Sequence, residues 1–301
     1  MGLLVALVNV ILPVIVVAGT GFALGRFFTL DAATISKIAL YALTPALCLN
    51  VLLTTQVSGQ TGVAVVGAYV LVCLLGAAIA GLLTPKVAAP TRRAVMASVA
   101  IANSGNMGLP IALFALGQAG FEQSVLMFIA SVVLGFIVGP LLFGASGGLK
   151  GSLIGLLKLP TLWAIVVALL MRLLGWQLPT GIMRGVEMLS NAALPIVLLS
   201  LGIQLGATKR VKLTRAVWTA TLIRVLGMPF LSLGIGLLFG LRGVPLQALV
   251  LAGAMPTAVN AFLLAMEYKG DVRTTADTVT MTTILSLFSA AAVTAALPLL
   301  P

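Results

Sequence analysis

Long apolar runs follow one another along almost the whole chain and are separated by short polar connections. Ten of these runs are long enough to cross the hydrocarbon core of a bilayer, which is about 30 Å thick and requires about 20 helical residues. They cover residues 3–24, 33–53, 62–83, 94–116, 124–143, 159–174, 185–205, 216–238, 246–266 and 275–297. The pattern therefore predicts an all-α integral membrane protein with ten transmembrane helices and no additional soluble domain.

The amino-acid composition excludes several classes of protein. Hydrophobic residues make up 61% of the chain and charged residues only 8%, whereas a soluble domain carries about 25% charged residues. The chain contains no His, and its two Cys lie within apolar runs, which excludes a hydrolase with a His base and a His-bound haem or zinc site. We therefore expect neither an enzyme nor a resident metal or cofactor.

The basic residues are distributed unevenly between the connections. The net charge is +11, but because the charges lie between apolar runs we interpret them as topology signals and lipid anchors, not as a nucleic-acid surface. Cytoplasmic loops carry the excess of Lys and Arg, so the bias predicts a multi-pass protein of the plasma membrane (the bacterial inner membrane) with both termini outside. Thirteen of the 17 basic residues follow odd-numbered runs: Arg26, Lys37, Lys86, Arg92, Arg93, Lys150, Lys158, Lys209, Arg210, Lys212, Arg215, Lys269 and Arg273.

Three features recur at nearly the same offset along the chain. The pairs are Pro45 with Pro195, Pro13 with Pro160, and Arg92 with Arg242. Concordant offsets suggest two five-helix repeats, residues 1–148 and 149–301. Because five is odd, the second repeat enters the membrane inverted relative to the first, which is the architecture of many secondary transporters. We also expect the first run, which follows Met1 without a basic leader, to be a retained helix.

The fourth run is interrupted by the sequence ANSGNMGLP, residues 102–110. Gly weakens a helix, Pro removes a backbone hydrogen bond, and polar groups at this depth are tolerated only against protein or a water-filled cavity. We therefore predict a helix break at the bilayer midplane. The residues assigned to the break are Gly105, Gly108 and Pro110, and those assigned to substrate binding are Asn103, Ser104 and Asn106.

The ninth run contains a similar segment, GAMPTAVN, residues 253–260, in which Pro256 is assigned to the break and Thr257 and Asn260 to substrate binding. In an inverted repeat the two breaks would meet and cross, and their half-helix N-termini would direct free N–H groups into one cavity suited to a carboxylate. The alternative is that these amides and glycines only mediate close helix packing. Two matched interruptions favour a binding site.

Two charged residues within the runs are further candidates. Arg224 lies about 12 Å of helix rise from the cytoplasmic edge of its run, so we expect it to face the protein interior and either to pair with a substrate anion or to tie helices together. Snorkelling of its long side chain to the interface is the alternative. Asp277, near the start of the last run, is the candidate for proton coupling, although an Asp there also complements the helix dipole.

The segment from Asn103 to Pro110 resembles the helix-four motif of the auxin efflux carrier family, which includes bacterial malonate-type carriers and plant auxin exporters. Residues 256–261 and the later Glu267-Tyr268 are similar to its helix-nine segment, and Arg224 before Pro229 matches a basic residue before Pro in its helix eight. The resemblance extends over essentially the whole chain. The residues that match the family's motif positions are Asn103, Asn106, Pro110, Pro256 and Asn260.

This resemblance implies a ten-helix fold related to bile acid/sodium symporters, with a scaffold subdomain, a transport subdomain and broken helices four and nine that cross. It also implies carboxylate substrates, elevator-like movement and frequent homodimers. The long hydrophilic insert of the plant carriers is missing, since only residues 144–158 connect the fifth and sixth runs. We therefore expect a secondary active transporter of a small organic anion, auxin- or malonate-like, with Na⁺ or H⁺ as a possible coupling ion. The alternatives are a sodium-coupled organic acid symporter, a channel or a non-transporting receptor.

Overall fold

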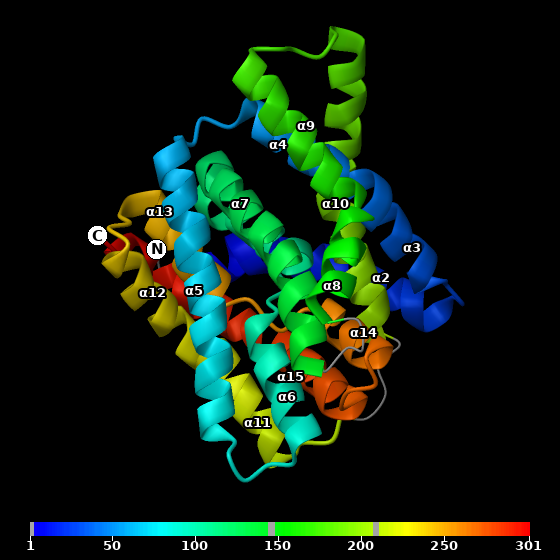
Figure 1. Cartoon of the computed structure of the whole chain (residues 1–301), viewed down its shortest axis with the longest axis vertical. Coiled ribbons are helices and arrows are strands. Elements are labelled where there is room, and N and C mark those ends of the chain that lie inside the picture. Colours follow the sequence, from blue (N-terminus) through cyan, green and yellow to red (C-terminus); the bar gives the residue numbers. More distant parts are fainter. Residues whose placement is uncertain (1–2, 144–147, 207–210) are drawn as a thin grey trace. The chain divides into compact units, whose positions relative to one another are not determined.

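The computed structural model describes residues 3–143, 148–206 and 211–301, and within them every regular element is helical (Figure 1). The chain divides into two compact units. Unit 1 comprises Met1–Pro13, Ser58–Leu153 and Lys209–Pro301, and unit 2 comprises Val14–Val57 and Ile154–Thr208. Each unit therefore combines helices from both halves of the sequence. Lys209 and Arg210, two of the basic residues used to predict the topology, lie outside the described residues.

Unit 1 contains most of the helices. Its core is formed by small and apolar side chains of α5, α6, α7 and α13, represented by Ala68, Ala97, Met127 and Leu249. Small residues at such positions let helix backbones approach closely in a membrane. The elements of unit 1 are α1 (Leu3–Ala6), η1 (Leu7–Ile11), α5 (Gly59–Leu83), α6 (Ala89–Ala100), η3 (Ser104–Gly108), α7 (Leu109–Phe143), α11 (Arg215–Leu222), η4 (Ile223–Gly227), α12 (Met228–Leu238), α13 (Gly243–Gly253), α14 (Val259–Glu267), α15 (Val272–Ala296) and η5 (Leu297–Leu299).

Unit 2 contains α3 (Ala32–Ile38), η2 (Ala39–Leu43), α4 (Thr44–Thr54), α9 (Pro160–Leu174) and α10 (Thr180–Gly206), while α2 (Leu12–Phe27) and α8 (Gly148–Leu157) each begin in unit 1 and continue into unit 2. Figure 1 shows α4 and α9 side by side, and they pack against each other. Arg172 of α9 donates from Nη1 to the carbonyl oxygens of Leu52 (2.9 Å) and Thr55 (3.3 Å) at the end of α4. A cationic side chain at this place satisfies carbonyls that have no intrahelical partner.

Glycine pairs bring α2 and α10 of unit 2 into backbone contact. At each of four glycines, an added Cβ would meet the backbone of the other helix. They are Gly21 and Gly25 of α2 and Gly202 and Gly206 of α10. At Gly202 a Cβ would overlap the carbonyl oxygen of Ala18. Each helix thus presents two glycines four positions apart, the small-residue pattern that permits close approach of transmembrane helices.

Four widened, π-helical turns occur in the described residues, and each ends two positions before a proline. They are η1 before Pro13, η2 before Pro45, η3 before Pro110 and η4 before Pro229. Proline has no N–H to donate and its ring collides with a carbonyl of the preceding turn. Widening that turn avoids the collision while other backbone bonds are kept. The prolines are visible in the sequence, but these widened turns were not predicted from it.

Seven helices in the described part of the chain are long and apolar enough to cross a membrane, whereas the sequence predicted ten. The difference has three sources. The fourth and ninth runs are divided by breaks, and α9 has only 15 residues. The range of α7 holds two helices, the end of the fourth run and the fifth run, which meet at a kink where Gly117 has non-helical backbone angles (φ 66°, ψ −161°). The chain is a multi-pass membrane protein, and its ten-helix count and its division into inverted repeats at residues 148 and 149 stay predictions.

Candidate functional site

Two helix breaks lie together within unit 1. The first separates α6, which ends at Ala100, from η3 and α7, and Ile101 in this break has extended backbone angles (φ −96°, ψ 91°). The second separates α13, which ends at Gly253, from α14, and Ala258 in this break is also extended (φ −71°, ψ 145°). The second break falls within the predicted segment 253–260, and the first begins at Ile101, one residue before the predicted segment 102–110.

The two breaks pair with each other like short antiparallel strands. The N–H of Asn103 donates to the carbonyl oxygen of Pro256 at 2.8 Å, and the N–H of Ala258 donates to that of Ile101 at 2.8 Å. Ala102 and Thr257 form the isolated bridge between them. These bonds satisfy backbone groups that unwinding would otherwise leave unpaired away from water. The residues 101–103 and 256–258 are called the crossing below.

Thr257 is fully buried at the crossing. Its hydroxyl donates to the carbonyl oxygen of Ser98 near the end of α6 (2.7 Å), and its N–H donates to Oγ1 of Thr282 in α15 (3.1 Å). Thr257 therefore ties three segments of unit 1 together. Its assignment to substrate binding stays a prediction, because the hydroxyl proton is already used within the protein.

Asn103 organises the first break with both its backbone and its side chain. Its Oδ1 accepts the N–H of Asn106 at 3.1 Å and so caps the start of η3, while its carbonyl oxygen accepts the N–H of Gly108. Asn103 is 4% exposed, and its amide nitrogen Nδ2 has no hydrogen-bond partner in the structure. A buried donor without a partner costs about 1–3 kcal/mol. Asn106 is only partly buried.

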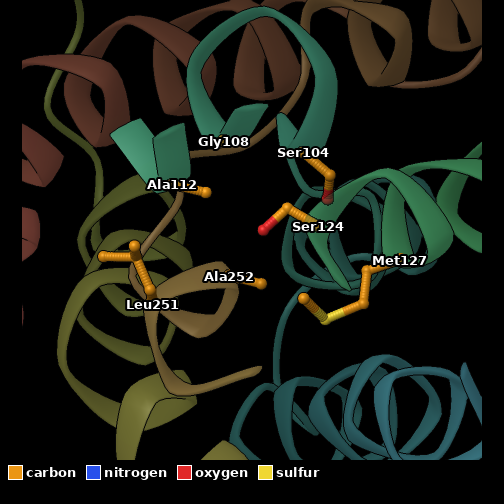
Figure 2. A pocket seen from close by; sticks show the side chains of 7 residues that line it. All are labelled: Ser104, Gly108, Ala112, Ser124, Met127, Leu251 and Ala252. Atoms are coloured by element: carbon orange, nitrogen blue, oxygen red, sulfur yellow. The ribbon is translucent and has the colours of Figure 1, made fainter. Parts of the chain in front are cut away.

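Ser104 lies at the edge of a small pocket in unit 1. Its Oγ is 2.7 Å from the hydroxyl of Tyr69, which comes from α5. Figure 2 shows the side chains of Ser104 and Ser124 directed into the space opposite Ala252. Sequence reasoning missed Tyr69 and Ser124, since both lie in regular helices with no local interruption to mark them. The pocket is lined by Ser104, Gly108, Ala112, Ser124, Met127, Leu251 and Ala252.

The residues assigned to the breaks have distinct roles. A Cβ on Gly105 would lie 2.6 Å from Cε2 of Phe128, whereas a Cβ on Gly108 would make ordinary contacts at 3.4 Å. A side chain at Gly105 would therefore force the Phe128 ring to move, whereas one at Gly108 would fit. Pro110 is the second residue of α7 and directly follows the widened turn η3, which accommodates its ring. Pro256 supplies the carbonyl oxygen that accepts from the first break.

Arg224 lies in η4 and is 1% exposed. Its Nε donates to the carbonyl oxygen of Met255 (2.7 Å), Nη1 to that of Val99 (2.9 Å) and Nη2 to that of Ala252 (3.2 Å). The side chain therefore faces the interior and ties helices together, one of the two inward roles expected. It does not snorkel to the interface, because its donors are engaged inside unit 1. Pairing with a substrate anion stays a prediction.

The two remaining candidates, Asn260 and Asp277, take no part in the hydrogen bonds described above. Asn260 is the second residue of α14 and is exposed. Asp277 is 9% exposed in α15, and its Oδ2 lies 3.7 Å from Nε of Arg273 one turn earlier. The start of α15 is capped by Asp271 instead. A coupling role for Asp277 stays a prediction.

Asp271 connects the start of α6 to the start of α15. Its Oδ2 accepts the hydroxyls of Thr91 (2.6 Å) and Thr274 (2.8 Å), and its Oδ1 accepts the N–H of Thr274 (3.0 Å). Partial burial would raise the pKa of Asp271, but the hydrogen bonds from Thr91 and Thr274 outweigh it and hold the pKa below its ordinary value. The carboxylate is therefore the form that this junction stabilises.

Comparisons with known proteins point to transport. The profile of a family described as membrane transport protein matches residues 148–294. An "Uncharacterized transporter" of Methanothermobacter thermautotrophicus is 29% identical over 296 residues, which are 93% of this chain and 94% of that protein. A "Putative malonate transporter" of Rhizobium meliloti is 25% identical over 199 residues, 62% of each chain. The "Uncharacterized transporter YfdV" of Escherichia coli K12 is 26% identical over 163 residues, 51% of this chain and 52% of that protein.

Proposed function

We propose that this chain is a bacterial-type member of the auxin efflux carrier family, which its motifs resemble, and that it is a secondary active transporter of a small organic carboxylate. The observation that carries the proposal is the crossing of the two breaks, in which Asn103 bonds to Pro256 and Ala258 to Ile101. Such paired interruptions are where secondary transporters bind their substrates. Malonate is the first substrate to test, because one relative is named for it.

Four helix ends lie at the crossing, and the two N-terminal ends among them favour an anion. The C-terminal ends of α6 and α13 carry partial negative charge, and the N-terminal ends of η3 and α14 carry partial positive charge. The start of α14 has no side-chain cap. The N–H of Ala261 donates to the carbonyl oxygen of Ala258, so the N–H groups proposed for the ligand are those of Val259 and Asn260. A carboxylate placed there would receive backbone hydrogen bonds as well as a favourable dipole.

Asn103 supplies a further donor to the proposed site. Its oxygen is already used by the N–H of Asn106, so the group with unused hydrogen-bonding capacity is Nδ2, a donor. A carboxylate oxygen would satisfy it, whereas a cation would not. Asn106 and Asn260, near the starts of η3 and α14, carry amides that could complete the set.

The proposed mechanism is alternating access of the elevator type. All bonds of the crossing lie within unit 1, so this unit could carry the site as one body while unit 2 serves as the scaffold. Binding of the anion would shift the equilibrium between two positions of unit 1 only if one position binds it better. Coupling to Na⁺ or H⁺ and assembly into homodimers are further proposals that this mechanism permits.

The test is counterflow of labelled malonate in proteoliposomes that contain the purified full chain. A carrier gives saturable uptake that is accelerated by unlabelled malonate inside the vesicles, and competing mono- and dicarboxylates define the substrate class. A channel would give uptake without acceleration, and a receptor would bind malonate without flux. The same assay with and without a sodium gradient, and at two values of pH, identifies the coupling ion.

A further inference from the structure

One arginine is bonded to both broken helices at their carbonyl ends. Arg224 contacts the carbonyl oxygen of Val99, the next-to-last residue of α6, and that of Ala252, the next-to-last residue of α13. Its third bond goes to Met255, within the second break. The helical turn that carries Arg224 thus holds the C-terminal ends of both half-helices.

The charge of this side chain is matched by helix ends. The last carbonyls of a helix have no intrahelical partner, and the helix dipole makes this end partly negative. A guanidinium stays protonated and offers several donors in a fixed planar fork. Arg273 pairs with the carboxylate of Asp277, whereas the hydrogen bonds of Arg224 all go to backbone carbonyls. The two C-terminal ends therefore take the place of a carboxylate partner.

The turn that carries Arg224 is itself held in place. Pro229 follows the widened turn η4, and the hydroxyl of Ser289 in α15 donates to the carbonyl oxygen of Val225 in that turn. Gly253 at the end of α13 lets the backbone of Met228 approach, since a Cβ there would lie 2.9 Å from the Met228 carbonyl oxygen. A side chain supported in this way has little freedom to follow a substrate, which suits a structural clamp.

We propose that Arg224 is the positioning residue of the crossing. Its guanidinium joins the C-terminal ends of α6 and α13, which sets the register in which Asn103 meets Pro256 and Ala258 meets Ile101. Its positive charge also neutralises these two ends, so that the field felt by an anion comes from the N-terminal ends of η3 and α14. The positioning role of Arg224 is inferred from its hydrogen bonds alone. Only the effect of its charge on the anion rests on the proposed function.

The first experiment needs no substrate. Hydrogen–deuterium exchange of the purified full chain compares the wild type with Arg224→Lys, which keeps the charge but loses the fork, and Arg224→Gln, which keeps amide donors but loses the charge. We expect exchange in peptides that cover 101–103 and 256–258 to rise about tenfold or more in both variants, because bonds to charged donors are lost. Unchanged exchange at the crossing in both folded variants would overturn the clamp.

Arg172 supplies the matched control. It also donates to carbonyl oxygens at a helix C-terminus, those of Leu52 and Thr55, but it does so in unit 2. Arg172→Gln should raise exchange at the end of α4 and leave the crossing unchanged. Equal effects of Arg172→Gln and Arg224→Gln on the crossing would mean that loss of any arginine bonded to helix-end carbonyls loosens the protein, and the specific role of Arg224 would be rejected.

The second experiment measures malonate binding and chemical rescue. Arg224→Ala should bind malonate about 10- to 100-fold more weakly than the wild type, and added methylguanidinium should restore part of the affinity by occupying the vacated space. Affinity within twofold of the wild type, or a loss that methylguanidinium does not reverse, would overturn the role of the charge. If the wild type itself binds no malonate, the proposed substrate is wrong, while the exchange data still decide the clamp.

Discussion

The carbonyl oxygen of Ile101 accepts the N–H of Ala258 at 2.8 Å, although the two residues belong to different halves of the chain. Together with the bond from Asn103 to Pro256, it fixes the two helix breaks against each other within unit 1. The consequence is that four helix ends meet at one place. Arg224 occupies the two carbonyl ends. At the N–H ends, Asn103 caps the start of η3, whereas the start of α14 has no side-chain cap, and it is beside these ends that we propose an anion binds.

Replacement of Asn103 should weaken anion binding. In Asn103→Ala both the cap on Asn106 and the donor Nδ2 are lost, and we expect malonate affinity to fall about 10- to 100-fold. Isothermal titration with malonate measures the change. Asn191→Ala, at an exposed position of α10 in unit 2, is the control and should bind as the wild type does. Equal affinity of the Asn103 variant and the wild type would contradict the proposed site.

A side chain at Gly105 should destabilise unit 1. The added Cβ of Gly105→Ala would lie 2.6 Å from Cε2 of Phe128, so the ring must move, at a cost of about 1–3 kcal/mol. A lower midpoint of thermal unfolding in detergent is expected. Phe128→Leu should recover part of the loss in the double variant, and Gly234→Ala, where a Cβ meets nothing within 4 Å, should cause none. A Gly105→Ala protein as stable as the wild type would contradict the tight fit.

The glycine contact in unit 2 should be equally intolerant. In Gly202→Ala the new Cβ would overlap the carbonyl oxygen of Ala18, which is backbone and cannot rotate away. The helices must separate, and we expect a loss of about 1–3 kcal/mol or more in stability. Gly185→Ala on the same helix, where a Cβ meets nothing within 4 Å, is the control. Similar unfolding midpoints for the two variants would show that α2 and α10 do not pack as described.

The junction at Asp271 should make stability depend on pH in the acidic range. Because the pKa of Asp271 is lower in the folded protein than its ordinary value, its carboxylate stabilises the fold above the unfolded pKa of about 4, and this contribution is lost as the pH falls through the folded pKa. Asp271→Asn should therefore lower the unfolding midpoint at pH 7, and the difference from the wild type should shrink below about pH 4. A difference that does not vary with pH would contradict this assignment.

The sequence predicted the breaks because their residues contrast with the apolar runs around them. The clusters at 102–110 and 253–260 combine Gly, Pro and amides, and each feature has a local physical cost that can be read without a structure. The partners of these segments could not be predicted in the same way. Tyr69 and Thr282 lie in regular helices, and only tertiary packing brings them to Ser104 and Thr257.

Arg224 illustrates the same limit. Its position within an apolar run predicted an inward orientation, but its partners are backbone carbonyls, which every residue has and no sequence pattern marks. The helix count differed for a related reason. Hydropathy counts apolar runs, whereas the breaks and the kink at Gly117 decide how those runs are divided into helices.

Hydrogen–deuterium exchange with and without malonate tests the central claim most directly, since it locates the anion on the chain. Once binding has been measured, we expect malonate to slow exchange in peptides that cover 104–108 and 259–262, where η3 and α14 begin, and to leave the peptides of unit 2 unchanged. Protection confined to other segments at saturating malonate, with exchange at these two helix starts unaltered, would contradict the account.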